Sequence, residues 1–302
     1  MIIGHQLILK TFKRLHSQNS LAHAYLFVGP AQVGKATVAL KIAEIIQGVE
    51  NDNQDMLVIS SQPREAEGGK EAGVTIKQIR SMQHFLSLSV FQAKFKVVII
   101  DGIDTLNRDA TTSLLKTLEE PPPNSIIICI SSHYEKILPT ITSRCQVIRF
   151  GLVKESFIEI FVSNNSPRLA KRLSRLASGR PGVAINFLIN TKLIKDYELI
   201  LKKLIEIEDA EIYEKLLFAK KISENYVKFQ EMLTYWQLLL RDKMLAQIGC
   251  GDLSINEVMK KNGKYDIIKL SELLRNAQEL VTGMQNPSFN LRLALENFLL
   301  QL

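Results

Sequence analysis

The sequence predicts an α/β fold, in which a parallel sheet is covered by helices, followed by a region made of helices alone. Between residues 1 and 150, short apolar runs alternate with helical patterns, as is typical of parallel sheets. After Phe150 the strand signal disappears, and from Thr191 onward every segment looks helical. We therefore expect a sheet domain over 1–150, a small helical domain over 151–192 and a helical bundle over 193–302.

The first domain is expected to contain five strands and four long helices. Each strand is predicted from a short apolar run, and each helix from apolar residues at helical spacing. A polar stretch with glycines at 61–73 predicts an exposed loop. The expected strands are 24–28, 55–60, 96–101, 125–131 and 145–150, and the expected helices are 5–18, 35–47, 75–88 and 107–119.

The remainder of the chain is predicted to be helical. Pro167 and Pro181 suit the first turn of a helix, and Ser166 is a natural N-cap for the helix that follows it. The longest amphipathic run contains Trp236, and the apolar stripes of the last helices indicate the core of a bundle. The expected helices are 153–163, 167–178, 181–190, 196–208, 224–248, 270–284 and 290–300.

Composition excludes several classes of protein. The chain has 302 residues, of which 46% are hydrophobic and 23% are charged, as in an ordinary globular protein. Its three cysteines form no C-x-x-C pair, so neither a disulfide framework nor a metal site is predicted. Without a long apolar run or a signal peptide, we expect a cytoplasmic protein that does not contact membranes. The net charge of +7 permits contact with nucleic acid but does not require it.

The stretch 29–36 has the pattern of a phosphate-binding loop that lacks one chemical group. Gly29, Gly34 and Lys35 stand at the positions of a G-x-x-x-x-G-K motif, between an expected strand and an expected helix. Backbone N–H groups, the helix N-terminus and the lysine can together hold phosphates. The next position should offer a hydroxyl to Mg²⁺, but it is Ala36. We expect a site that can hold ATP or ADP but is poorly built to hydrolyse it.

The acidic half of the same site is also incomplete. The apolar run 96–100 ends in Asp101, where a carboxylate would lie beside the metal of an ATPase. The following position usually supplies the glutamate that orients the attacking water, but here it is Gly102. The alternative is that both runs are buried strands with no role in nucleotide binding. The pairing of Asp101 with the loop around Lys35 favours a nucleotide site that has been released from hydrolysis.

Several segments resemble the clamp-loader branch of AAA+ proteins, and most closely its delta-prime family in bacterial DNA polymerase III. The most specific match contains Ser113-Leu114-Leu115-Lys116-Thr117-Leu118-Glu119-Glu120-Pro121-Pro122. Another ends in the Ser143-Arg144-Cys145 signature of clamp loaders. The segments 21–30, 73–80 and 290–296 are also similar to the corresponding parts of this family.

This resemblance implies a RecA-like AAA+ domain, a helical lid and a C-terminal collar. It implies a hetero-oligomeric ring with tau/gamma ATPase subunits and a delta subunit, which reaches the sliding clamp and primed DNA as a complex. It also implies that Arg144 is an arginine finger, completing the ATP site of a neighbouring subunit. The alternative from the residues alone is an intramolecular ion pair near the sheet edge.

Other family positions differ here. Working ATPases of the family carry a sensing arginine in the lid, where this chain has Gly182; Arg180 is nearby but is not assigned that role. Ser131 and Ser132 end a strand where the family has a polar γ-phosphate sensor, although strand-end hydroxyls commonly cap turns. Many relatives have four zinc-binding cysteines between the nucleotide loop and the acidic strand. This chain has none in that interval, so we expect no zinc.

Three functions remain possible from the sequence. The first is a clamp-loader subunit that hydrolyses nothing and requires no cofactor, but lends Arg144 to a neighbour. The second is an active ATP-hydrolysing motor, which would need substitutes for the groups missing at Ala36 and Gly102. The third is a DNA-binding module that acts alone, although no basic tract with interleaved aromatic residues is present.

Overall fold

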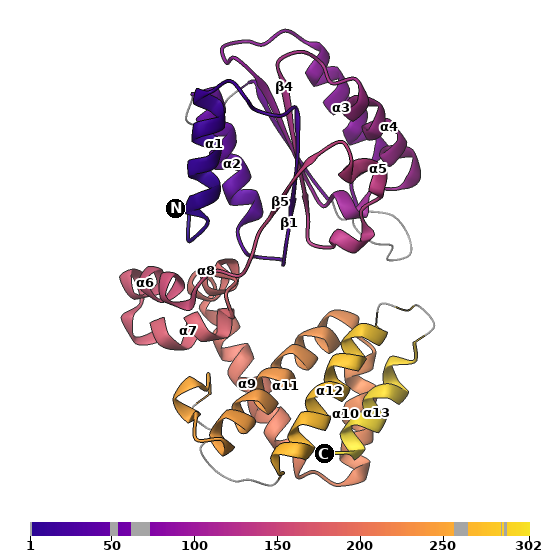
Figure 1. Cartoon of the computed structure of the whole chain (residues 1–302). Coiled ribbons are helices and arrows are strands. Elements are labelled where there is room, and N and C mark those ends of the chain that lie inside the picture. The colour runs from indigo at the N-terminus through magenta and orange to yellow at the C-terminus, as the bar shows by residue number, and fades with distance from the viewer. Residues whose placement is uncertain (1, 49–53, 62–72, 257–264, 285, 287–288) are drawn as a thin grey trace. The chain divides into compact units, whose positions relative to one another are not determined.

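The computed structural model describes residues 2–48, 54–61, 73–256, 265–284, 286 and 289–302. The chain forms two compact units, drawn in Figure 1. The first comprises Met1–Asn164 and Ala177–Ala184, and the second comprises Asn165–Leu176 and Ile185–Leu302. The expected division into three domains stays a prediction. The expected loop at 61–73 lies almost entirely outside the described residues.

The first unit is built on a parallel sheet of five strands, which confirms the predicted α/β fold. The strand order is β2-β3-β4-β1-β5, so that the strand before the glycine loop lies inside the sheet. The register pairs Leu26 with Cys129 and Ile99 with Ile128. The strands are β1 (Ala24–Val28), β2 (Met56–Ser60), β3 (Lys96–Asp101), β4 (Ser125–Ser131) and β5 (Gln146–Arg149).

Helices cover both faces of this sheet, as Figure 1 shows. Because side chains alternate along a strand, Tyr25 and Phe27 pack under α1 and α2, whereas Leu26 and Val28 face the opposite side. That opposite side is covered by α3, α4 and the short α5. The helices are α1 (Gln6–Ser17), α2 (Lys35–Gln47), α3 (Ile76–Ser87), α4 (Arg108–Glu119) and α5 (Pro139–Thr142).

Two further helices follow the sheet in the chain. The first, α6 (Glu155–Asn165), belongs mostly to the first unit, and the start of α8 (Pro181–Ile189) also belongs to it.

The prediction that Ser166 caps a helix is wrong. Ser166 makes no side-chain capping bond, because Pro167 begins a single 3₁₀ turn, η3 (Pro167–Leu169), before the α-helix starts.

The second unit is helical, and its core contains Trp236 and Phe298 in an edge-to-face contact. One of its helices, α10, lies in the segment that was expected to be helical but received no range of its own. Three of its large apolar side chains, Ile212, Tyr213 and Leu217, are exposed. The helices are α7 (Ala170–Ala177), α9 (Thr191–Glu208), α10 (Ile212–Ser223), α11 (Tyr226–Gln247), α12 (Ile267–Gly283) and α13 (Leu291–Leu300).

Candidate functional site

The glycine loop joins β1 to α2 in a backbone shape that its two motif glycines permit. Gly34 precedes α2 with a φ of 101°, in the left-handed region that favours glycine. Gly29 has a φ of 149°, and a Cβ at this position would lie 2.2 Å from the carbonyl oxygen of Phe150. Phe150 directly follows β5, so Gly29 is also needed for the close approach of the loop to the end of that strand.

Lys35 is turned back into its own loop. Its Nζ donates hydrogen bonds to the carbonyl oxygens of Gly29 and Pro30, at 2.8 and 2.7 Å, and to Ser132 Oγ at 3.1 Å. Only 6% of the residue is exposed. Burial lowers the pKa of Lys35, and the negative charges of Asp101 and Asp104 partly oppose that shift. The ammonium therefore already has three acceptors within the protein.

Two other segments bond to the carbonyl groups of the loop. The His5 ring Nε2 lies 3.0 Å from the Val33 carbonyl oxygen, and burial lowers the pKa of this histidine. The N–H of Gly182, at the start of α8, donates to the Gln32 carbonyl oxygen at 2.9 Å. A Cβ at Gly182 would lie 3.0 Å from Gln32, so a side chain here would press against the loop. Gly182 is the position at which the resemblance to clamp loaders led us to expect a sensing arginine in an active ATPase.

Asp101 ends β3 in the same electrostatic neighbourhood. Burial raises its pKa, while Lys35 works to lower it and Asp104 to raise it further. The next residue, Gly102, has a φ of 89°, and its carbonyl oxygen accepts a 2.6 Å hydrogen bond from the Thr105 hydroxyl. Gly102 thus differs from a glutamate in two ways, because it lacks the carboxylate and holds a backbone conformation that a glutamate adopts only with strain.

The two serines at the end of β4 have different partners. Ser131 Oγ accepts the backbone N–H of His133 at 2.9 Å, as a hydroxyl that caps a turn does. Ser132 Oγ receives the Lys35 bond described above. Of the two candidate sensors of phosphate, only Ser132 therefore contacts the side chain that would hold the phosphate.

The residues present fit phosphate binding better than they fit magnesium. A cradle for an anion is formed by the two glycines, the start of α2 and Lys35. The space beside Gly34 is open, because a Cβ at this position would have no other atom within 4 Å. The metal would have Asp101 as its ligand, without a hydroxyl at Ala36. A phosphate would also have to compete with two carbonyl oxygens and a hydroxyl for Lys35.

Arg144 lies in the other half of the unit, at the junction between α5 and β5. Its Nη2 donates to Glu119 Oε1 at 2.6 Å, and its Nη1 donates to the Thr140 carbonyl oxygen at 2.9 Å. The side chain is 34% exposed, and that of Glu119 is 50% exposed. Since β5 is an edge strand of the sheet, Arg144 is anchored near the edge but remains open to solvent.

Comparison with known proteins decides the family. The model of the DNA polymerase III delta-subunit family matches residues 4–154, half of the chain. The chain belongs to this family. It is a clamp-loader AAA+ protein of DNA replication.

Relatives of this clamp-loader protein carry related names. A DNA polymerase III subunit gamma from Buchnera aphidicola is 26% identical, over 90% of this chain and 83% of the relative. A DNA polymerase III subunit delta' from Bacillus subtilis is 28% identical, over 57% of this chain and 55% of the relative. The alignment with the second relative thus spans about half of its length.

A solved structure supports the fold. A DNA polymerase III gamma subunit-related protein from Thermotoga maritima has a TM-score of 0.50 and 21% identity, and covers 97% of each chain. At this identity the likeness bears on the fold alone. Together with the parallel sheet, it confirms the expected AAA+ fold.

Two features are absent from the described ranges of the clamp-loader chain. No three His, Cys, Asp or Glu side chains gather there in a group that could hold a metal ion. No helix there is both long enough and apolar enough to cross a bilayer. The expectations of no zinc and no membrane contact stay predictions, because neither observation tests them.

Proposed function

We propose that this chain is a non-hydrolysing, delta-prime type of clamp-loader subunit that lends Arg144 to the ATP site of a neighbouring ATPase subunit. The observation that carries the proposal is the loss of two catalytic groups from separate segments. Ala36 has no hydroxyl for Mg²⁺, and Gly102 has neither a carboxylate nor the backbone conformation that a glutamate prefers. Such a chain needs no ATP or ADP of its own, although its loop retains groups that bind phosphate.

The position of Arg144 supports the second half of the proposal. Its guanidinium is held by an exposed ion pair, and such pairs are worth only about 0–1 kcal/mol. A phosphate that the neighbour holds in a desolvated site would compete well with Glu119 for the N–H donors of the Arg144 guanidinium. Arg144 could therefore exchange Glu119 for a phosphate at little cost.

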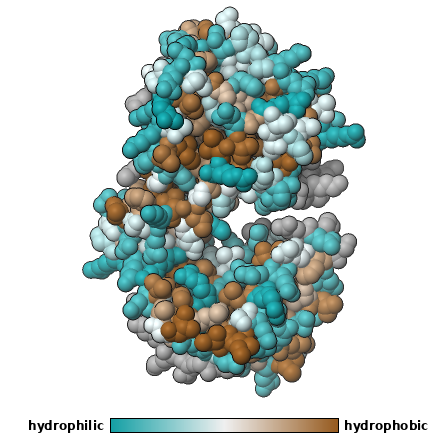
Figure 2. All heavy atoms as spheres, viewed as in Figure 1, coloured by the Kyte–Doolittle hydropathy of each residue, from teal (hydrophilic) through white to brown (hydrophobic). Residues whose placement is uncertain are grey.

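The surface supports assembly with other subunits. Figure 2 shows hydrophobic side chains gathered on the surface of both units. Ile212, Tyr213 and Leu293 are each at least 63% exposed on helices of the second unit. We propose that a cytoplasmic hetero-oligomer with gamma or tau and delta subunits covers such side chains, and that this complex engages the sliding clamp and primed DNA.

The test uses a clamp loader reassembled from this chain and its ATPase partners. With Arg144→Ala, the ATP site that receives the arginine should lose about 10³-fold or more in rate, while the complex still assembles. The ATPase rate of the whole complex should then fall by the fraction that this one site contributes. Arg149→Ala removes a nearby exposed arginine, whose contact is the Tyr134 ring at 4.9 Å, and should have no effect. Unchanged ATPase with Arg144→Ala would reject the arginine finger.

The alternative is an active motor subunit, which the name of the Buchnera relative favours. The active motor and the non-hydrolysing subunit are distinguished by measuring ATP turnover of the isolated chain with magnesium. Turnover that disappears with Lys35→Ala would establish the motor and overturn the non-hydrolysing assignment. An isolated chain without turnover, whose complex depends on Arg144, would support the proposal.

A further inference from the structure

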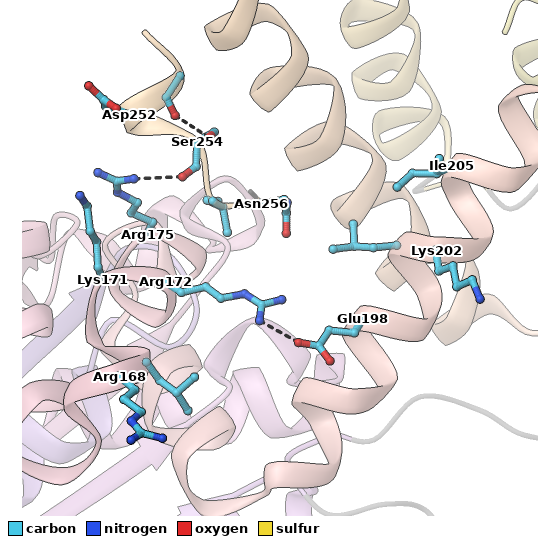
Figure 3. A pocket seen from close by; sticks show the side chains of 14 residues that line it. Arg168, Lys171, Arg172, Arg175, Glu198, Lys202, Ile205, Asp252, Ser254 and Asn256 are labelled. Atoms are coloured by element: carbon cyan, nitrogen blue, oxygen red, sulfur yellow. Dashed lines mark hydrogen bonds and ion pairs between the residues drawn. The ribbon is translucent and has the colours of Figure 1, made fainter. Parts of the chain in front are cut away.

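A cationic groove lies within the second unit, between α7, α9 and the 3₁₀ turn η4 (Gly251–Leu253). Its volume is about 870 Å³, and its lining contains five cationic and two acidic side chains. Figure 3 shows Arg172 reaching across the groove to Glu198, and Arg175 reaching toward Ser254. All the lining residues belong to the second compact unit, whereas the nucleotide loop and Arg144 belong to the first.

The cations are concentrated on one short stretch of chain. Arg168, Lys171, Arg172 and Arg175 follow the i, i+3, i+4, i+7 spacing, which places them along one face of η3 and α7. The helix α7 contains no acidic residue. Like charges at this spacing destabilise a helix by a few tenths of a kcal/mol per pair. Bound anions would relieve that repulsion.

The groove walls are held in place by bonds that leave part of this charge available. Arg172 Nη1 bonds to Glu198 Oε1 at 2.7 Å and so ties α7 to α9. Arg175 Nη1 donates to the Ser254 carbonyl oxygen at 3.0 Å. In contrast, the side chains of Arg168 and Lys171 have no ion pair or hydrogen bond within the described ranges, and both residues are exposed.

A buried network fixes the opposite wall. The Asp242 carboxylate, on α11, accepts the backbone N–H groups of Ile255 and Asn256, at 3.1 and 3.0 Å from Oδ2. The side chain of Asn256 also donates to Asp242 and accepts the Tyr197 hydroxyl. A groove whose walls are already ordered loses less entropy when a ligand binds.

We propose that this groove binds the sugar–phosphate backbone of single-stranded nucleic acid. The stretch 168–175 rises by roughly 10–14 Å, enough to contact more than one phosphate of a single strand. The lining contains no aromatic side chain on which a base could stack, so binding depends on phosphates and not on sequence. A concave groove between helices accepts one strand more readily than a rigid duplex. The site is separate from the role of Arg144, and its failure would leave that role untouched.

The test measures the anisotropy of a labelled oligo(dT) of about 12 nucleotides with the full chain, at several salt concentrations. The variant Arg168→Ala/Lys171→Ala should bind more weakly, and its slope of log K against log salt should be shallower by about 1.4, or 0.7 for each lost contact. The matched control is Lys220→Ala/Lys221→Ala on α10, which removes the same charge from an exposed helix outside the groove. This control should change neither the slope nor the affinity beyond a small general effect of charge.

A variant that binds more tightly provides a second test, because a damaged fold could weaken binding but would not strengthen it. Asp252→Asn removes an exposed negative charge from the groove and should strengthen binding several-fold at low salt. Equal losses for the groove variant and its control, or no binding by the parent, would overturn the proposal. Tighter binding to a blunt duplex, or equal displacement of the oligonucleotide by polyglutamate, would assign the groove to another partner.

Discussion

The guanidinium of Arg144 and the carboxylate of Glu119 lie 2.6 Å apart. The two residues come from the two motifs that most strongly resemble clamp loaders, separated by 25 positions in the chain. The contact holds the Arg144 side chain in one position within this chain, before the proposed neighbouring subunit binds. It also makes Glu119 a competitor for the ligand that Arg144 is proposed to meet.

Glu119→Gln should leave the stability nearly unchanged, because exposed ion pairs contribute about 0–1 kcal/mol. In the reassembled complex it should keep the ATPase at the parental rate or raise it by up to about fivefold, since 1 kcal/mol corresponds to about that factor. Urea unfolding and the ATPase of the complex measure the two effects. A loss of ATPase as large as that of Arg144→Ala would mean that Glu119 is required to position the arginine, and does not merely compete for it.

Lys35→Ala should destabilise the isolated chain even without nucleotide. The change leaves the carbonyl groups of Gly29 and Pro30 without their donor, at a cost of about 1–3 kcal/mol. Urea denaturation measures this cost. Lys41→Ala on the same helix removes a lysine that is 43% exposed and should cost less than about 1 kcal/mol. Equal stabilities for the two variants would show that Lys35 does not support the loop.

Gly102→Glu should not restore hydrolysis and should destabilise the fold. The backbone at this position has a φ of 89°, which costs an ordinary residue about 1–2 kcal/mol. A Cβ would meet the Thr105 hydroxyl only at 3.5 Å, so strain and not space is the obstacle. Gly102→Asn should cost less, because asparagine tolerates left-handed backbone better. Identical unfolding midpoints for the two variants would contradict this explanation.

Asp55→Asn should lower the stability by about 2 kcal/mol at neutral pH, since it weakens bonds to a buried charged acceptor. The carboxylate, only 1% exposed, accepts the N–H groups of Phe91, Gln92 and Ala93. Burial works to raise the pKa of Asp55, but these donors and the charge of Lys96 hold it below the ordinary 3.8.

The pH dependence follows from the sign of that shift. A lowered pKa in the folded state stabilises the protein above the unfolded pKa, and the contribution is lost as the pH falls through the folded value. The difference between parent and Asp55→Asn should therefore be constant near neutrality and shrink below pH 3.8. Urea unfolding at a series of pH values checks this. A difference that grows on acidification would contradict the assignment.

Much of the first unit could be predicted from local patterns. Buried parallel strands appear as apolar runs, so β1, β3 and β4 have the predicted ends, β2 begins one residue later than predicted, and β5 is one residue shorter at each end. Prediction was weaker in the second unit. There α9 begins at Thr191, five residues before the expected start, because Asn190 caps it. No range was predicted for α10, and several of its apolar residues are exposed in the structure.

The candidate site was only partly predictable. The glycines and Lys35 were found because a motif concentrates them in eight residues. The bond between His5 and Val33 was missed, because its partners are 28 positions apart and a lone histidine carries no signal. The groove at Arg168 and Lys171 was also missed, since basic residues at helical spacing usually form an exposed, solvated face.

The sequence alone determined which chemical groups this clamp-loader chain lacks, because a missing hydroxyl at Ala36 and a missing carboxylate at Gly102 are covalent facts that no folding can alter. Tertiary structure decided where the remaining charges go. Folding brings Arg144 to Glu119, which is 25 positions away, and brings Lys35 to the Ser132 hydroxyl, which is 97 positions away. These pairings depend on distances between segments far apart in the chain, and no local pattern of residues encodes them.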